Sequence, residues 1–340
     1  MSADRIIVCG PAVRVGIVGA YLAARWASEG RELVIVAEDE ETDEAVLLRP
    51  GFERFHGEVG LAPDTLSGAA PALATSVPTH DGVIEFPFSP FGMANAGVDF
   101  HHYWQRAGKV SEQPGLPEFS LALALADKAE RADLSKLPVA VGLRISRRAY
   151  SQALLSLAER HGAQLDPVFD ASVSEHSLLV DCRNSNARPR WEGTQLVVAS
   201  DHDIDGIESA ICIGAARRLV ALMADLGNNS AEQAEYNRLA EQEVERIADM
   251  RELLACVDPR STSRQALKRK VDLFEACGRI PTEDFEVFLP PEWLAALWSR
   301  GVRPRRHDRM ASAMPEADLL QWLAALRRQI GEIAGGSYAA

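Results

Sequence analysis

The sequence predicts an α/β fold organised around a doubly wound parallel sheet. Two short apolar runs, at residues 6–9 and 33–37, have the length and composition of buried strands. Between them, residues 15–29 are expected to form an apolar helix that Gly30 closes at its carboxyl end. A strand, a helix and a second strand in immediate succession are typical of parallel strands joined by a crossover helix. We therefore expect the two runs to lie in one sheet.

The next hundred residues have no long periodic stretch. Residues 39–140 are mixed and rich in proline, glycine and alanine, which predicts loops, short strands and insertions. A helix is then expected from Ser146, as its amino-terminal cap, to His161. Apolar residues recur there every three to four positions, and Gly162 follows as a stop signal.

The rest of the chain predicts one more strand and then helices. The strand is expected at residues 177–182, and two of the helices at residues 205–226 and 318–333. This pattern suggests two domains. The first is expected at residues 1–225, with the parallel sheet and an inserted substrate region at about 50–140, and the second is a helical carboxyl-terminal region at 226–340.

The turn after the first strand has the layout of a dinucleotide-binding site. Such a turn needs a G-x-G-x-x-G pattern. The first glycine makes a tight turn, the second admits the phosphates, and the third lets helix and strand pack closely. These positions hold Gly10, Ala12 and Val15, and Gly16 would take the third place if the turn were one residue longer. The expected fold is therefore a FAD/NAD(P)-binding, Rossmann-like sheet with an eroded phosphate-binding turn.

Glu38 ends the second strand, where a carboxylate would bind the ribose hydroxyls of a dinucleotide. The alternative is a solvated acidic loop, because residues 38–41 are all acidic. Helix N–H groups can hold a phosphate without the full glycine pattern. The sequence therefore predicts FAD binding that is weakened but not abolished.

The amino-acid composition limits which partners and which cellular compartment we expect. The formal net charge of −13 argues against nucleic acid and anionic membrane surfaces as main partners. The 5 cysteines are widely spaced and include no C-x-x-C pair, which favours a reducing compartment. No apolar run free of charge reaches the roughly 18 residues of a membrane span. We therefore expect a cytoplasmic protein.

Several segments in collinear order resemble the flavin-dependent tryptophan halogenases, a branch of the flavin monooxygenases. The matching segments are residues 6–10, 19–23, 34–38, 43–45, 55–61, 88–92, 100–104, 150–162, 180–182, 205–209, 236–238 and 301–304. The resemblance implies a cofactor, FAD, that reacts with oxygen and chloride to give hypochlorous acid for use beside a lysine. The chain is shorter than is usual in the family, and most of the missing length falls between Cys182 and Asp201.

The catalytic residues that the resemblance implies are missing. The family's lysine lies in a Thr-Phe-Lys-Leu-Gly segment, and its place here is taken by Ala74, which has no amine. The family's Trp-x-Trp-x-Ile-Pro signature is absent, since no two tryptophans lie two residues apart. We therefore expect a degenerate member with no catalytic residue and no halogenase activity.

The halide and flavin loop also departs from the family. The resemblance implies Ser-Thr-Gly after a glutamate, whereas this chain has Ser209-Ala210-Ile211, whose bulk hinders the close approach of an anion or a flavin. The cofactor-binding candidates are Gly10, Ala12, Val15, Gly16, Glu38, Asp201 and Ser209.

Two further patterns favour structural roles. The adjacent His101 and His102 point apart on regular structure, so we expect them to pack and not to share a metal. The acidic residues at 201, 203 and 205 suit the amino end of the following helix, with a metal site as the alternative. We expect no metal site.

Three functions remain open. The first is a pseudoenzyme that acts as a non-catalytic partner or binding subunit, its partner being a full-length halogenase relative or a second copy of itself. The second is an active FAD-dependent monooxygenase or oxidase with altered chemistry. The third is a small-molecule binder that uses the vacated cleft. Bound flavin would distinguish the enzyme from the other two.

Overall fold

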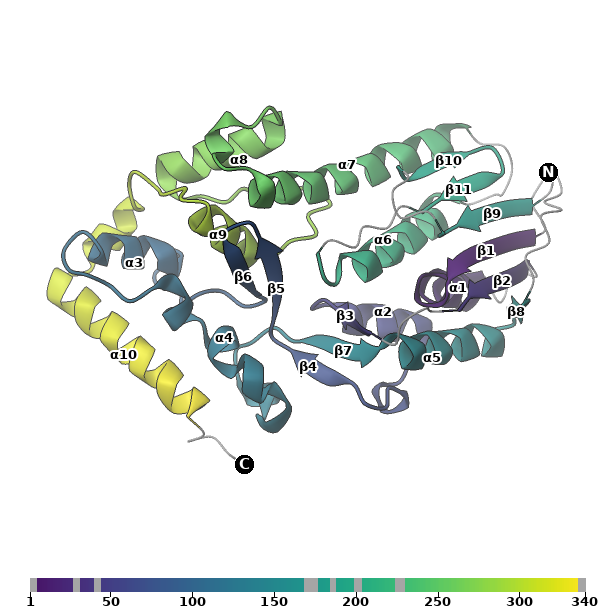
Figure 1. The fold of residues 1–340 in the computed structure, drawn as a ribbon, viewed down its shortest axis with the longest axis horizontal. Coiled ribbons are helices and arrows are strands. Elements are labelled where there is room, and N and C mark those ends of the chain that lie inside the picture. Colours follow the sequence, from purple (N-terminus) through teal and green to yellow (C-terminus); the bar gives the residue numbers. More distant parts are fainter. Residues whose placement is uncertain are drawn as a thin grey trace. The chain divides into compact units, whose positions relative to one another are not determined.

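The computed structural model describes residues 5–26, 31–39, 44–167, 177–183, 188–198, 204–223 and 230–335. The chain forms two compact units, each made of two stretches of sequence (Figure 1). The first unit joins Met1–Ala70 to Gly142–Glu245, and the second joins Pro71–Val141 to Arg246–Ala340. This division differs from the expected domains. The first unit continues past residue 225, and most of the expected insertion belongs to the second unit.

A doubly wound sheet forms the centre of the first unit. Its strand order is β10-β11-β9-β1-β2-β8, and neighbouring strands are parallel except β10 and β11. The strands are β1 (Arg5–Pro11), β2 (Glu32–Glu38), β8 (Gln164–Leu165), β9 (Ser177–Asp181), β10 (Arg190–Glu192) and β11 (Gln195–Val197). The chain places β2 and β8 on one side of β1 and then β9 and β11 on the other, so the strand order reverses between β1 and β9 (Figure 1).

The central helix of this unit is α1 (Ala12–Trp26), which is apolar on nearly every side. It packs against β2, α5 (Arg147–Arg160) and α6 (Ile207–Leu222), and a helix covered on several faces needs such a sequence. A Cβ at Gly19 would lie 2.4 Å from Ile35 Cδ1, and a Cβ at Gly16 would lie 3.2 Å from Leu154 Cβ. Gly19 therefore brings α1 close to β2, while Gly16 brings it close to α5.

The other elements of the first unit surround this core. β3 (Ala45–Leu48) pairs antiparallel with β7 (Gly142–Ser146), and α2 (Phe52–Val59) packs on α1. The predicted cap of α5 is present, since Ser146 Oγ accepts a hydrogen bond from the Ala149 N–H at 3.3 Å. Two elements, β4 (Ala70–Ala72) and α7 (Ser230–Ala255), run across the boundaries between the units in sequence.

The second unit is mostly helical and contains one β-hairpin. Its elements are β5 (Ala74–Thr79), β6 (Gly82–Pro87), α3 (Phe100–Ala107), α4 (Leu121–Leu125), α8 (Gln265–Cys277), α9 (Pro290–Ser299) and α10 (Glu316–Ala334). Short 3-10 helices lie at Pro63–Thr65 in the first unit and at Leu116–Phe119, Ala126–Arg131, Leu134–Lys136, Pro259–Ser261 and Arg309–Ala313 in the second. Leu73, Ala122 and Leu125 share a core cluster, against which Ile333 of α10 packs.

The predicted elements are present with shifted ends, and the predicted α/β class is confirmed. α1 begins at Ala12, three residues before the expected start, because it follows β1 directly without a glycine-rich turn. The strand at 177–182 is β9, and the helices at 205–226 and 318–333 are α6 and α10. Within the part of the chain that the structure describes, no helix is both long enough and apolar enough to cross a membrane.

We expect Gly10→Ala to destabilise the protein more than Gly82→Ala does. The two glycines have similar φ angles, +140° and +133°, so each substitution strains the backbone at a cost of about 1–3 kcal/mol. Only at Gly10 would the added Cβ also meet backbone, 2.9 Å from the carbonyl carbon of Cys182; nothing lies within 4 Å at Gly82. Urea unfolding measures the difference. Equal losses of unfolding free energy would contradict the close approach of β1 and β9.

Candidate functional site

The candidate site lies beyond the carboxyl ends of β1 and β9, at the point where the strand order reverses. Open parallel sheets bind ligands at this position because the connections leave it in opposite directions. The amino end of α1 follows β1 directly here. Helix amino ends attract anions through their N–H groups and dipole. We call the residues around this point, on the strands β1, β2 and β9 and the helices α1, α5 and α6, the junction.

Gly10 keeps β1 and β9 close together at the junction. Their pairing continues past the end of β9, since the Cys182 N–H donates to Cys9 O at 2.8 Å. A Cβ at Gly10 would lie 2.9 Å from the Cys182 carbonyl carbon and 3.0 Å from Arg183 N. The missing Cβ at Gly10 therefore lets the backbone after β9 approach β1 closely, which suits the first position of the glycine pattern, where the chain turns tightly.

Arg14, in the first turn of α1, places a guanidinium at the junction. The residue is only 5% exposed. Its Nε donates to Glu208 Oε1 at 2.7 Å, and its Nη1 donates to Cys182 O at 2.9 Å. Arg147 Nη2 donates to the second oxygen of the same carboxylate. A buried charge is tolerated when it is paired and hydrogen-bonded, and Glu208, itself 6% exposed, supplies the anion for both arginines.

Glu208 is held in position by the start of α6. It lies in the first turn of this helix, where the dipole favours a negative side chain. Ser209 Oγ is 3.1 Å from Leu47 O and 3.1 Å from Gly206 O, and it donates to these carbonyls. Gly206 caps the helix with a φ of +82°. The hydroxyl of Ser209 thereby fixes α6 against β3, and Glu208 points towards α1.

A second ion pair lies at the more exposed edge of the junction. Arg183 binds Asp181 through two contacts, Nε–Oδ1 at 3.0 Å and Nη2–Oδ2 at 2.7 Å. Burial would raise the pKa of the Asp181 carboxyl, but the hydrogen bonds from Arg183 outweigh it and hold that pKa below its usual value. Glu38 ends β2 opposite Pro11, is exposed, and interacts electrostatically with Arg183.

The described cofactor-binding candidates differ in what their side chains face. Gly10, Ala12, Val15, Gly16 and Ser209 are all buried. Gly16 lies inside α1 facing α5, so it is not part of a turn. Glu38 is the exposed candidate and stands at the predicted end of β2. Asp201, together with the acidic residue at 203, lies outside the described residues.

Ala74, the residue that the sequence predicts at the family's lysine position, is a small side chain in the second unit. Ala74 opens β5, is half-buried, and stands opposite Pro87 of β6. The same unit contains a fully buried lysine, Lys270 of α8. Its Nζ lies 2.8 Å from Glu286 Oε2 and 3.6 Å from the ring centroid of Trp293. An ion pair and a cation–π contact therefore hold this ammonium inside the protein, where it acts as a structural cation.

Three buried thiols lie on the strands and helix of the junction, at Cys9, Cys182 and Cys212. Burial, and then the nearby charge of Asp181, raises the pKa of Cys9 to about 11. Burial likewise raises the pKa of Cys182 and of Cys212. Because the thiolate is the reactive form, these cysteines serve as packing residues.

His101 and His102 of α3 bind backbone groups of their own unit. His101 Nε2 donates to Gly278 O at 2.7 Å, and His102 Nδ1 accepts from the Asp308 N–H at 3.2 Å. Burial lowers the pKa of both imidazoles, and it brings that of His102 to about 4. Among the residues that the structure describes, no group of three or more histidine, cysteine or acidic side chains is arranged to hold a metal ion.

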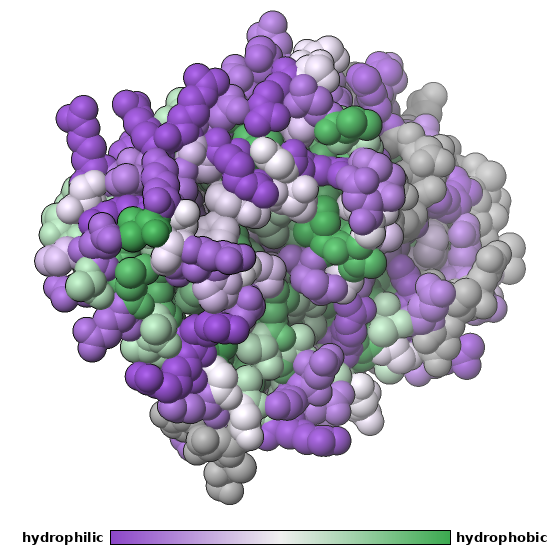
Figure 2. Space-filling view, turned by 60° about the vertical axis from the view of Figure 1, so that its left-hand side comes forward, coloured by the Kyte–Doolittle hydropathy of each residue, from purple (hydrophilic) through white to green (hydrophobic). Residues whose placement is uncertain are grey.

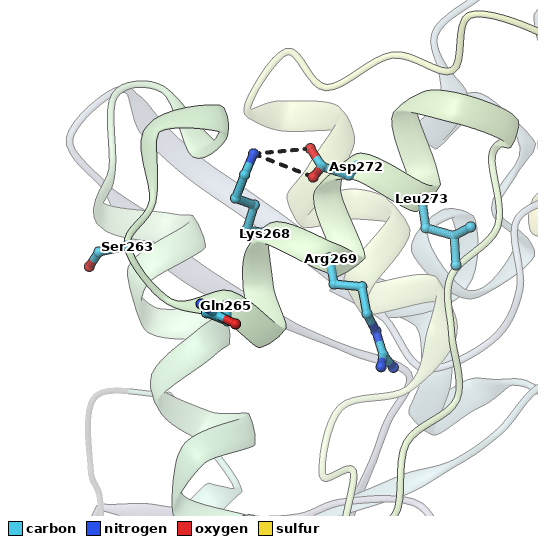
Figure 3. Close-up of a pocket in the computed structure, with 6 residues that line it drawn as sticks. All are labelled: Ser263, Gln265, Lys268, Arg269, Asp272 and Leu273. Carbon is cyan, nitrogen blue, oxygen red and sulfur yellow. Dashed lines mark hydrogen bonds and ion pairs between the residues drawn. The ribbon is translucent and has the colours of Figure 1, made fainter.

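A pocket on the second unit lies along α8 (Figure 3). It is lined by Ser263, Gln265, Lys268, Arg269, Asp272 and Leu273. Lys268 and Asp272 turn towards each other, with Nζ 3.3 Å from Oδ2, while Arg269 points away from this pair (Figure 3). Ligand sites usually combine apolar walls with a few converging polar groups. These polar groups spread along one helix, so the pocket does not have the form of an active site.

Comparison with known proteins identifies the fold. A family model described as tryptophan halogenase matches residues 199–316. A flavin-dependent halogenase from Brevundimonas sp. BAL3 aligns over 98% of this chain and 96% of its own, with a TM-score of 0.81 and 17% identity. The chain has the fold of the flavin-dependent halogenases. The predicted resemblance to the tryptophan halogenases is confirmed.

Two further halogenase structures are also similar to this chain over nearly their whole length. A flavin-dependent halogenase from Xanthomonas campestris has a TM-score of 0.82 at 14% identity, covering 98% of this chain and 96% of that one. A tryptophan 6-halogenase from Streptomyces toxytricini has a TM-score of 0.74 at 11% identity, covering 98% and 97%. No curated protein sequence matches the chain.

Sequence reasoning missed Arg14 and Arg147 and their pairing with Glu208. Arg14 was visible as the only charged residue among residues 12–24, in a helix that is otherwise apolar. A charge at such a position predicts a buried ionic partner. The partner could not be identified, because Glu208 is 194 residues away in sequence.

We expect Arg14→Met to lower the free energy of unfolding by about 3–5 kcal/mol, because it removes one partner of a buried ion pair. Glu208→Leu should lower the free energy of unfolding less in the Arg14→Met variant than in the wild-type protein. The double-mutant cycle should give a coupling energy of about 1–3 kcal/mol. Arg5→Met is the control, since its pair with Glu32 at 3.3 Å is exposed and is worth at most about 1 kcal/mol. Additive losses in urea unfolding would argue against the junction network.

We expect His56→Gln to weaken the loss of stability below neutral pH. His56 of α2 is buried beside Tyr150, with Nε2 3.1 Å from its hydroxyl oxygen, and burial lowers the His56 pKa from 6.5 to about 4. The unfolded chain therefore binds more protons between these pH values, so stability falls as pH falls through this window. The measurement is the difference in Tm between pH 7 and pH 5.

Tyr150→Phe is the matched control for this pH dependence. It removes only the hydroxyl and keeps the imidazole of His56 buried, so it should retain the wild-type difference in Tm. If His56→Gln retained it as well, the acid sensitivity would come from other groups.

Proposed function

We propose that this halogenase-fold chain is a pseudoenzyme that acts as a binding or partner subunit and does not halogenate. The observation that supports this proposal most directly is the set of contacts that Arg14 makes at the junction. Where a flavin-binding relative would be expected to hold the phosphates of its cofactor, Arg14 contacts Glu208 and the carbonyl of Cys182, just after β9.

FAD is the cofactor to test, because the structural neighbours are described as flavin-dependent. The residues at the start of α1 do not fit its pyrophosphate. Side chains stand at Ala12 and Val15, where the binding pattern has glycine. The guanidinium of Arg14 is already bound to an internal carboxylate. These two observations support weakened FAD binding.

The absence of an amine at the lysine position supports the loss of halogenation. Ala74 offers no group that could hold or form a chlorinating species, and Lys270 is fully buried beside Glu286 and Trp293. The family model matches residues 199–316, which leaves the start of α1 and Ala74 outside the match. The part of the sequence that matches the family therefore includes neither the start of α1 nor Ala74.

The proposed partner would cover exposed apolar side chains of the second unit. Of the large apolar side chains that are exposed among the described residues, Val83, Met93, Val110, Val257, Phe285 and Met310 belong to this unit, and Leu165 belongs to the first. Apolar residues form separate patches among hydrophilic ones on the face in Figure 2. The proposed partner is a full-length halogenase-family relative, with self-association as the alternative.

An active flavin monooxygenase or oxidase with altered chemistry is the second candidate function. Glu38 favours it, because this exposed carboxylate ends β2 where a dinucleotide ribose would bind. Such an enzyme would have to hold the cofactor without the phosphate contacts of a glycine-rich turn.

We expect the purified, desalted protein to lack the absorbance bands of flavin and to show no thermal shift on adding FAD. The positive control is the flavin-dependent halogenase from Brevundimonas, handled identically. Retained flavin, or a saturable thermal shift with FAD, would overturn the pseudoenzyme proposal and favour the second candidate. Sedimentation of the chain alone, and mixed with a full-length halogenase from the same source, then separates self-association from pairing with a relative.

A further inference from the structure

Helix α7 contacts the outermost strand of the sheet in the first unit (Figure 1). Of the strands that the structure describes, β10 lies at one end of the six-stranded sheet, so one side of its backbone has no strand beside it. Asn237 Oδ1 accepts from the Trp191 N–H at 2.6 Å, and Asn237 Nδ2 donates to Trp191 O at 3.0 Å. Just past the strand, Gln233 Oε1 accepts from the Gly193 N–H at 3.3 Å, and Gln233 Nε2 donates to Gly193 O at 3.1 Å. Side-chain amides therefore bind the edge of β10.

The spacing of these residues explains how a helix can take the place of a strand. Residues two apart in a strand direct their N–H and C=O groups to the same side, and they lie roughly 6.6–6.8 Å apart. Trp191 and Gly193 have this spacing. Residues four apart in a helix lie about 6 Å apart on one face, which is the spacing of Gln233 and Asn237. An amide side chain has both a donor and an acceptor, so each one can pair with both backbone groups of one residue, as a neighbouring strand would.

The sequence of β10 suits it to pair with a second copy of itself. In an antiparallel pair with Trp191 opposite Trp191, the two residues would exchange both of their backbone hydrogen bonds. Arg190 of each copy would then face Glu192 of the other, and cross-strand pairs of opposite charge stabilise a sheet. These two side chains are 66% and 73% exposed, and they lie on one face, with Nη2 3.1 Å from Oε2. An uncovered β10 edge would therefore be self-complementary.

We propose that the edge of β10 is a surface for pairing with a second copy of this chain, and that Gln233 and Asn237 keep it closed. Open sheet edges invite pairing between molecules, and proteins often cover them with another element. This inference goes beyond the proposed function and does not depend on whether FAD binds. It implies that any self-association of the wild-type protein uses a surface other than β10.

Packing holds α7 where its amides reach the strand. Tyr236, which is fully buried, lies edge-on to Trp191, with the ring centroids 5.9 Å apart and the planes at 90°. The guanidinium of Arg218 lies over the other ring of this pair, 5.6 Å from the centroid of Tyr236. Without the amides, α7 would cover the N–H and C=O of Trp191 and the N–H of Gly193 without bonding them. Buried backbone groups need partners, so release of the first turns of α7 and pairing with a second β10 would become favourable.

The first test replaces both amides by apolar side chains of similar size, Gln233→Met and Asn237→Leu. Both new residues favour a helix, so α7 itself should still form. We expect this double variant to self-associate about tenfold or more tightly than the wild-type protein in sedimentation over a range of concentrations. Hydrogen exchange at the Trp191 amide should be faster than in the wild-type protein when the variant is dilute, and should slow as its concentration rises. Sedimentation identical to that of the wild-type protein at every concentration would overturn the proposal.

Charge reversal on β10 tests the pairing itself. In the double variant, Arg190→Glu would place a carboxylate opposite Glu192 of the other copy and should cancel the gain in association. Adding Glu192→Arg restores opposite charges across the pair and should restore the association. Aggregation of a partly unfolded chain has no reason to follow this pattern. Association that is unaffected by either change would therefore show that β10 is not the surface involved.

Single variants of α7 keep these tests interpretable. Gln242→Leu removes an amide of the same helix that makes no hydrogen bond within the described part of the chain, and it should sediment like the wild-type protein. Asn237→Asp keeps the acceptor for the Trp191 N–H but loses the donor, so it should be destabilised. It should not associate, because it places negative charge at the edge. Asn237→Leu alone takes the place of the double variant if that protein does not fold.

These outcomes are separate from those that test the proposed function. Flavin retained by the wild-type protein would overturn the pseudoenzyme proposal and leave the closed edge in place. A double variant that does not associate, in a chain whose wild type is colourless, would overturn only the closed edge.

Discussion

The first unit depends on neutralising the charge that Arg14 carries into the protein. A guanidinium that is almost fully buried must find an anion within hydrogen-bond distance, or its desolvation would exceed the gain from packing α1. Glu208 supplies that anion, and a carbonyl at the end of β9 accepts a second hydrogen bond. This requirement fixes the start of α6 relative to α1, and the glycines of α1 then set how closely β2 and α5 approach.

Much of the first unit could be predicted from local patterns. The apolar runs of β1 and β2, the apolar helix between them and the capped helix α5 all follow from spacing and capping residues. The start of α1 was placed three residues late, because the glycine pattern suggested a turn at residues that are helical. The local sequence pattern predicts whether a segment forms a helix or a strand. It predicts less well where one element ends and the next begins.

The rest could not be predicted because it depends on contacts between distant parts of the sequence. Arg14 and Glu208 are 194 residues apart, and each unit joins two stretches that another part of the chain separates. The candidate site illustrates this limit. Glu38 was found because its position depends on one strand end, whereas Arg14, Arg147 and Glu208 gain meaning only when three helices come together.

The network around Arg14 has a consequence for the evolutionary history of such a chain. Once a buried arginine and its carboxylate have become mutually dependent, replacing either one alone removes stability before any ligand can compensate for it. A change at Arg14 would leave Glu208 buried on Arg147 alone, and a change at Glu208 would leave two guanidiniums without their carboxylate. Each substitution is unfavourable by itself, so the two positions can be exchanged only together.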